Sequence, residues 1–289
     1  MSVSFKDQVV LVTGSSRGLG RAFAECIAAA GGHVVVNSTG RDDSGDRACD
    51  EIATSGGLAT HIACRVENAE DLVGEVLARC GRLDAVIHNG GFIEDKTIRK
   101  MTNQQWDDVL DVHLGAAFRL TRAAWPHFQQ QGGRIVLISS SAGLYGNFGQ
   151  ANYAAAKMGM VGLARTIALE GARENIRCNV VAPFGATEMN SAGWDDSFKS
   201  MIETRHVAPL VAWLAHPDCD ESGGLFEASA GSFKKVRLER STGLVLSDDQ
   251  ITIDDVAAGW DQIVDFSSSE HPANMGESLE LMYRHRGQR

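Results

Sequence analysis

Short apolar runs alternate with helix-like segments along most of the chain, and this alternation restricts the possible folds more than any other feature. The first run, residues 9–13, is uncharged and mostly β-branched, which is typical of a parallel strand buried on both faces. Such alternation predicts a Rossmann-type, doubly wound parallel α/β sheet in three layers, with right-handed crossovers. We expect strands at residues 9–13, 33–37, 59–64, 83–88, 135–139, 176–181 and 224–229, with helices at 18–30, 46–54, 69–80, 103–130, 151–172 and 207–215.

The composition excludes several classes of function. A net charge of −10 argues against a nucleic-acid partner. No apolar run approaches the roughly 20 residues of a membrane span, so we expect no membrane partner. The six cysteines are scattered without a C-x-x-C motif, which indicates a reducing compartment and neither disulfides nor a metal site. The ends carry no recognisable targeting signal, and the expected location is cytoplasmic.

Several chemically distinctive residues directly follow the expected strands. Gly14, Asn89, Ser140 and Pro183 each come after one of them. In a doubly wound sheet the carboxyl ends of the strands share one edge, and ligands bind there. Gly14 opens a glycine-rich turn between the first strand and a helix, where backbone N–H groups can hold a phosphate. The alternative is a turn that serves only chain packing.

Tyr153 and Lys157 form the most specific candidate reaction centre. They are four residues apart, so on a helix they lie one turn apart on the same face. An ammonium beside a phenol favours the phenolate, which would lower the tyrosine pKa and make Tyr153 a general acid/base. Ser140, at the end of a strand, could donate to the same substrate oxygen. A tyrosine and a lysine at this spacing are also common on helix surfaces. The pair therefore indicates a reaction centre only in combination with the other motifs of the chain.

Two motifs together resemble the classical short-chain dehydrogenase/reductase family over about residues 7–231. They are Thr13-Gly14-x-x-x-Gly18-x-Gly20 and the set Ser140, Tyr153 and Lys157. The resemblance implies NAD(P) binding and hydride transfer between a secondary alcohol and a ketone, with Lys157 also on the nicotinamide ribose. The cofactor-binding residues that it implies are Gly14, Ser16, Arg17, Gly18, Leu19, Gly20, Ser38, Val66, Asn89, Gly91, Tyr153, Lys157 and Pro183.

The second half of the chain is similar to one branch, the (3R)-hydroxyacyl-CoA dehydrogenase part of peroxisomal multifunctional β-oxidation enzymes. This implies (3R)-hydroxyacyl-CoA/3-ketoacyl-CoA interconversion and a homodimer or homotetramer that pairs through the helices near 103–130 and 151–172. A hydroxysteroid dehydrogenase, a 3-oxoacyl-carrier-protein reductase and, outside the enzymes, a nucleotide-sensing protein remain alternatives. The segments that carry the similarity are Tyr145-Gly-Asn-Phe-Gly-Gln-Ala-Asn-Tyr153, Val112-His113-Leu114, Thr121-Arg-Ala-Ala-Trp125, Val207-Ala-Pro-Leu-Val211 and Gly223-Gly-Leu-Phe-Glu227.

The chain departs from the family pattern in three respects, the last of which concerns two cofactor-facing residues. His88-Asn89-Gly90-Gly91 stands where Asn-Asn-Ala-Gly is common. His113 replaces a fourth catalytic Asn, and it either holds a proton-relay water near Lys157 or only packs. Ser38 stands where NAD-using members have an acid on the ribose 2′-OH, and Cys64 replaces an acid near the adenine. Without an acid at 38, and with Arg17 or Arg41 to pair with a 2′-phosphate, we expect NADP(H) to be preferred and NAD to remain possible.

The pattern loosens after Pro183. Met189, Trp194, Phe198 and Met201 predict a lid over an apolar substrate, or alternatively an internal core. Residues 1–231 then form the catalytic domain, and residues 232–289 form an extension that we expect to pack on it. The extension contains a basic cluster that could bind coenzyme A phosphates, or be a solvated face, and an amphipathic helix that begins at a Thr252–Asp255 capping box. The basic cluster is Lys234, Lys235, Arg237 and Arg240, and the apolar stripe is Val256, Trp260, Ile263 and Val264.

Overall fold

The computed structural model describes residues 3–187, 193–246 and 250–287. The chain divides into two compact units, residues 1–235 and 236–289, and each is described here by itself. Across the described ranges, no helix combines the length and the apolar character that a membrane span needs.

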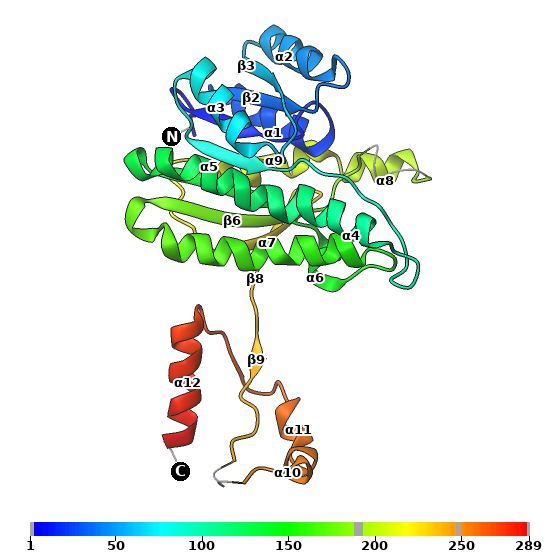
Figure 1. The fold of residues 1–289 in the computed structure, drawn as a ribbon, viewed down its shortest axis with the longest axis vertical. Helices are drawn as coiled ribbons and strands as arrows, with labels where there is room; N and C mark the ends of the chain where they lie inside the picture. The colour runs from blue at the N-terminus through cyan, green and yellow to red at the C-terminus, as the bar shows by residue number, and fades with distance from the viewer. Residues whose placement is uncertain (1–2, 188–192, 247–249, 288–289) are drawn as a thin grey trace. The chain divides into compact units, whose positions relative to one another are not determined.

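An eight-stranded sheet in the order β3-β2-β1-β4-β5-β6-β7-β8 forms the centre of the first unit (Figure 1). Every neighbouring pair from β3 to β7 is parallel. The direction of strand order reverses between β1 and β4, and in doubly wound sheets ligands bind at the carboxyl ends of the strands at such a reversal. The strands are β1 (Val9–Val12), β2 (His33–Ser38), β3 (Leu58–Ala63), β4 (Ala85–His88), β5 (Gly133–Ile138), β6 (Ile176–Pro183), β7 (Leu225–Ser229) and β8 (Ser232–Val236).

Helices cover both faces of this sheet, so the central strands are sealed from water. Val10, Val12, Val34 and Val36 are fully buried, and full burial stabilises each such side chain by about 1.5–3 kcal/mol. One face carries α1 (Gly18–Ala29), α2 (Ser44–Thr54) and α9 (Ala208–Leu214); the other carries α3 (Ala69–Cys80), α4 (Asn103–Leu110), α5 (Ala116–Gln131) and α7 (Ala151–Glu170) (Figure 1). The three-layer prediction is confirmed.

The segment expected to be one helix over residues 103–130 is three elements. Between α4 and α5 lies a π-helical turn, η1 (Asp111–Gly115), which contains His113. A π turn inserts an extra residue into the helix and is common at functional sites. Helical periodicity alone does not reveal it, because the flanking α-helices keep the apolar pattern. Thr102 caps the start of α4 with a complete capping box to Gln105.

The boundary between the two units falls after residue 235, whereas the predicted domain boundary is at residue 231. β8 follows β7 after only Ala230 and Gly231, whose φ angles of 49° and 72° are those of a two-residue hairpin. A hairpin makes β8 an antiparallel strand of the main sheet. The predicted packing of the extension on the catalytic domain stays a prediction.

The second unit is built on a short antiparallel pair, β9 (Arg240–Ser241) with β10 (Ser269–Glu270). The predicted capping box at Thr252 and Asp255 is present. The amphipathic helix is in fact two short ones, α10 (Ile253–Ala258) and α11 (Trp260–Ile263), separated at Gly259. A final helix, α12 (Met275–Gly287), ends the described part of this unit.

Candidate active site

Lys157 lies one turn beyond Tyr153 in α7 and is buried, with 2% of its surface exposed. Its Nζ donates to the carbonyl oxygen of Ile138, at the end of β5, at 2.7 Å. The hydroxyl of Ser139 donates to the Lys157 carbonyl at 2.7 Å, which ties α7 to the same strand end. Burial lowers the pKa of Lys157 to about 7. The charged ammonium is therefore less favoured here than on an exposed lysine.

Tyr153 is held at the start of α7 by its neighbour Asn152. The fully buried Asn152 side chain donates to the carbonyls of Glu94 and Gln105 at 3.2 and 2.9 Å, and it accepts the Tyr153 N–H at 2.8 Å. Sequence reasoning missed this role. The Tyr145–Tyr153 similarity segment contains Asn152, but its partners lie 47 and 58 residues away in the chain.

The pKa of Tyr153 is raised above its usual value, first by burial, and a hydrogen bond with the Ser140 side chain opposes this rise. The sequence predicted a lowered pKa, and the structure shows the opposite direction. Burial of the phenol is the cause, and Lys157 does not offset it: its Nζ is directed to Ile138 and lies 5.3 Å from the centre of the tyrosine ring. A phenol with a raised pKa is a proton donor at neutral pH.

Ser140 begins a short helix that the sequence did not predict, α6 (Ser141–Tyr145). Its Oγ accepts the N–H of Ala142 at 3.2 Å, and this cap fixes the side-chain rotamer. Gly143 lies where α6 crosses α7, and a Cβ there would come within 2.8 Å of the Lys157 Cβ. The structure therefore brings Ser140, Tyr153 and Lys157 together as predicted.

His113 stands beside Tyr153, with ring centres 5.2 Å apart in a T-shaped arrangement. Its Nε2 donates to the carbonyl of Phe92 at 2.8 Å, so Nδ1 of the neutral ring carries a lone pair. No described group bonds to that buried Nδ1. Burial, followed by the charge of Lys157, holds the pKa of His113 well below its usual value. A neutral acceptor in this place fits either alternative, a relay water or simple packing.

Gly91 makes room for His113. A Cβ at Gly91 would lie 2.0 Å from Cε1 of the imidazole. The sequence placed Gly91 among the cofactor residues, and the structure gives it this supporting role as well.

The glycine-rich turn is packed too tightly for side chains. A Cβ at Gly20 would lie 2.5 Å from the carbonyl oxygen of Gly14, and one at Gly14 would lie 2.7 Å from the Cα of Gly90. Asn89 locks the turn by donating to the carbonyls of Thr13 and Gly14, each at 3.2 Å. The predicted residues Gly14, Gly20 and Asn89 therefore form one rigid unit at the edge of β1 and β4.

A histidine behind this turn completes its hydrogen bonds. The Thr13 hydroxyl accepts the N–H groups of Asn89 and Gly90 and is 3.0 Å from Nδ1 of His88. His88 Nε2 donates to the carbonyl of His113, so the Thr13 hydroxyl donates to Nδ1. Burial lowers the pKa of His88 to about 4, which keeps the ring neutral. His88 thus replaces the family's first Asn as a link between the cofactor turn and η1.

The start of α1 is suited to bind a phosphate. Arg17 is the N-cap residue and makes no side-chain cap, and Gly18 has a φ of 59°. No side chain of the cap residue therefore covers the backbone N–H groups of the first turn of α1, which are oriented to bind an anion. The start of α1 thus fits the pyrophosphate of a dinucleotide. The remaining predicted cofactor residues lie around the same edge: Val66 is buried after β3, and Pro183 ends β6.

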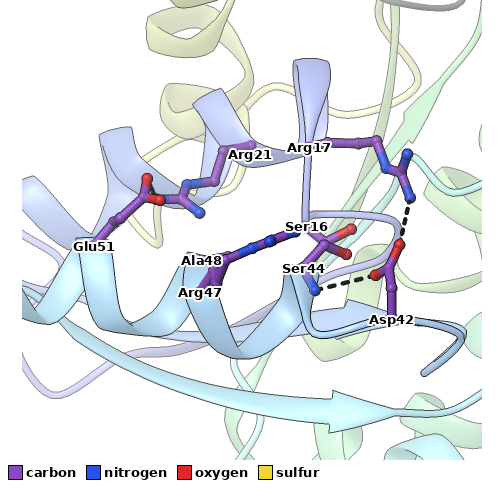
Figure 2. Close-up of a pocket in the computed structure, with 8 residues that line it drawn as sticks. All are labelled: Ser16, Arg17, Arg21, Asp42, Ser44, Arg47, Ala48 and Glu51. Carbon is purple, nitrogen blue, oxygen red and sulfur yellow. Dashed lines mark hydrogen bonds and ion pairs between the residues drawn. The ribbon is translucent and has the colours of Figure 1, made fainter.

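A cavity of about 260 Å³ opens beside this turn, between α1 and α2. Figure 2 shows Arg17 paired with Asp42 at one end, at 3.4 Å, and Arg21 near Glu51 at the other. Arg41 instead lines a second cavity together with Arg65. The first cavity is lined by Ser16, Arg17, Arg21, Asp42, Ser44, Arg47, Ala48 and Glu51.

The predicted lid residues are partly brought together. Trp194 and Phe198 contact each other with ring centres 5.3 Å apart, and Trp194 lies 5.7 Å from Phe184. Phe198 belongs to α8 (Asp196–Met201), which Asp195 caps. Met201 is 60% exposed, and Met189 lies outside the described residues. The aromatic cluster follows directly on β6, at the site edge of the sheet.

The proposed basic cluster is divided between the two units. Lys235 is paired with Glu221 at 2.9 Å in the first unit. Arg240 is paired with Glu270 at 2.7 Å in the second unit and donates to Ser278. Two of the four cations therefore already have acidic or polar partners, which weakens the expectation of a coenzyme A site.

The family model for short chain dehydrogenases matches residues 8–197, which include the glycine-rich turn, Ser140, Tyr153 and Lys157. The chain belongs to the short-chain dehydrogenase family. Members bind NAD(P) and are oxidoreductases, and the predicted fold, family and enzyme class are confirmed.

Three relatives show how far the similarity extends. The mouse peroxisomal multifunctional enzyme type 2 is 41% identical over 95% of this chain, but the chain spans only 39% of that protein. The Escherichia coli 3-oxoacyl-[acyl-carrier-protein] reductase FabG is 36% identical over 74% of this chain and 91% of its own length. The solved full-length peroxisomal multifunctional enzyme type 2 of Drosophila melanogaster superposes with a TM-score of 0.86 at 34% identity, over 99% of this chain and 50% of that one.

Proposed function

We propose that this short-chain dehydrogenase interconverts (3R)-hydroxyacyl-CoA and 3-ketoacyl-CoA. The reaction type is carried by the placement of Tyr153, Ser140 and Lys157 at the carboxyl edge of the sheet. The substrate is supported by the similarity to peroxisomal multifunctional enzymes across nearly the whole chain. The aromatic cluster of Phe184, Trp194 and Phe198 at the same edge suits an acyl chain.

Each side chain has a separate task. When bound, the nicotinamide group supplies or accepts the hydride. Tyr153 gives its proton to the ketone oxygen during reduction and takes it back during oxidation. Ser140 donates a hydrogen bond to the same oxygen, and Lys157 holds the nicotinamide ribose. His113 packs against the Tyr153 ring in the T-shaped contact and keeps it in place, because its Nδ1 is buried.

NADP(H) is the preferred cofactor in this proposal. Ser38 brings no negative charge to the ribose, and the cavity beside the turn offers Arg17, Arg21 and Arg47. Each of these arginines is paired with an acidic side chain. A 2′-phosphate that binds Arg17 would have to displace the acidic partner of Arg17. Comparing kcat/KM for NADPH and NADH tests the preference, and Ser38→Asp should shift it toward NADH. A wild-type preference for NADH contradicts it.

The substrate is tested with a panel of ketones. We expect reduction of acetoacetyl-CoA and of a longer 3-ketoacyl-CoA, and slower or no reduction of a 17-ketosteroid. The similarity to FabG over most of its length favours a second candidate, reduction of 3-ketoacyl groups on an acyl carrier protein. If only the carrier-protein thioester is reduced, the second candidate replaces the first. If the steroid alone is reduced, both fail.

We place the protein in the cytoplasm as part of this proposal. All six cysteines are free thiols, and Cys178 and Cys219 are buried, which fits a reducing compartment. A fluorescent fusion to the complete protein tests the location, and import into an organelle contradicts it.

A further inference from the structure

Ser38, at the end of β2, is joined to two other side chains in a hydrogen-bonded chain. Its Oγ lies 2.9 Å from Nε2 of His61 on the neighbouring strand β3. Nδ1 of His61 lies 2.8 Å from a carboxylate oxygen of Asp46 in α2. The His61 side chain is only 11% exposed, whereas the Asp46 side chain is 72% exposed. A half-buried serine, a nearly buried imidazole and a surface carboxylate are therefore connected in series.

The fold makes room for this imidazole. In the parallel pairing of β2 with β3, Val36 aligns with His61 and Ser38 with Ala63, so the two polar side chains point to the same face. That face is covered by α2 at Gly45, where a Cβ would lie 2.1 Å from Nε2 of His61. Only glycine at residue 45 lets the ring reach Ser38.

The partners fix the direction of the hydrogen bonds. The Asp46 carboxylate only accepts, so Nδ1 of His61 carries a hydrogen, and when the ring holds this one hydrogen alone, Nε2 is the acceptor. Ser38 must then donate its only hydroxyl hydrogen to Nε2. The Ser38 oxygen also accepts the N–H of Gly40 at 3.2 Å, and one lone pair remains. Ser38 therefore presents an acceptor, as a carboxylate would, but without the charge.

We propose that His61 and Asp46 are positioning residues that make Ser38 a neutral acceptor for the ribose 2′-OH of NAD. The inference rests on the proposed NAD(P)-dependent function and concerns the choice between the two cofactors. An acid at this position accepts the 2′-OH but repels a 2′-phosphate. A serine whose hydrogen is bound to His61 accepts the 2′-OH and carries no charge to repel the phosphate. The arrangement keeps NAD usable in a site whose arginines favour NADP.

The test is the binding of NAD and of NADP to the full chain, measured by calorimetry. In His61→Phe the Ser38 hydrogen loses its acceptor and turns outward, where it can donate to a phosphate. Because one hydrogen bond is at stake, we expect the Kd for NAD to rise about three- to tenfold, while the Kd for NADP stays equal or falls. Asp46→Ala removes only the surface carboxylate, and a smaller change in the same direction is expected.

His33→Phe is a matched control. His33 also bonds a hydroxyl on β3, that of Thr60 at 2.8 Å, but it lies at the opposite end of β2. Its replacement should leave the ratio of the two Kd values unchanged. In a Ser38→Ala background His61→Phe should have no further effect on that ratio, because the proposed effect passes through the Ser38 hydroxyl.

The outcomes separate the two proposals. If both dinucleotides bind and neither His61→Phe nor Asp46→Ala changes the Kd ratio, this inference is overturned and the proposed function stands. If the ratio changes equally with and without Ser38, His61 acts through the fold and the inference is also overturned. If neither dinucleotide binds the wild-type chain, the proposed function itself fails and the inference falls with it.

Discussion

Tyr153 provides the proton in the proposed reaction, and its replacement is the simplest test at the scale of one residue. Tyr153→Phe removes the hydroxyl and keeps the ring that contacts His113. We expect the fold and dinucleotide binding to persist and turnover to fall by about 10²–10⁴, the usual contribution of a general acid. Circular dichroism and steady-state kinetics provide the measurement. If this variant kept more than a tenth of wild-type activity, Tyr153 would not be the general acid.

Lys157 gives a pH dependence to stability. Its pKa is lowered to about 7 in the folded protein, because burial disfavours the ammonium. Between that value and the ordinary lysine pKa of about 10.4, the unfolded chain binds more protons than the folded one. The destabilisation caused by burying this amine is therefore greatest below about pH 7 and decreases as pH rises through that range, so folding stability increases with pH there.

The variant Lys157→Met separates this contribution from the others. The difference in unfolding free energy, wild type minus variant, should grow with pH above 7 by up to about 1.4 kcal/mol per pH unit. Denaturant unfolding at several pH values measures it. Lys96→Met at an exposed site serves as the control, with a difference that should not vary with pH. A pH-independent difference for Lys157→Met would show that its amine is not perturbed.

At the scale of elements, the turn from β1 into α1 depends on close backbone contacts. A Cβ at Gly20 would come within 2.5 Å of the Gly14 carbonyl and 2.6 Å of the Asn89 amide. In Gly20→Ala the turn has to shift, so we expect dinucleotide affinity to fall at least tenfold while the sheet stays folded. Gly74→Ala in α3, where nothing lies within 4 Å, should instead stabilise the protein by up to about 1 kcal/mol. Equal affinities for wild type and Gly20→Ala would contradict this account of the turn.

The elements that could be predicted are those whose signal is local. The strands at the centre of the sheet are mostly apolar runs, and their bounds agree with expectation within about two residues. The π turn at His113, the short helix after Ser140 and the break at Gly259 were missed. Each depends on contacts between distant segments, such as His113 with Phe92. The same reason applies to the site: the triad was visible as spacing, while Asn152 and the Ser38–His61–Asp46 chain connect segments that only the fold brings together.

At the scale of the whole molecule, the prediction that copies of the chain associate concerns α5 and α7. Phe118 on α5 and Met158 and Leu169 on α7 are 50%, 39% and 65% exposed. Apolar side chains on two helices are typical of a buried contact between subunits. We expect a homodimer or homotetramer, and Phe118→Glu should shift it toward smaller species in light scattering. Ile98→Glu, at an 80% exposed position outside these helices, is the control. A wild-type monomer at micromolar concentration would contradict the expectation.

The most direct test of the central claim is the product formed from a 3-ketoacyl-CoA. The purified chain is incubated with acetoacetyl-CoA and with a longer 3-ketoacyl-CoA in the presence of NADPH, and the hydroxyacyl product is resolved on a chiral column. Tyr153→Phe serves as the parallel sample. The account predicts the (3R)-hydroxyacyl product from the wild type and almost none from Tyr153→Phe. A (3S) product, or thioesters left unreduced while a ketosteroid is consumed, would contradict it.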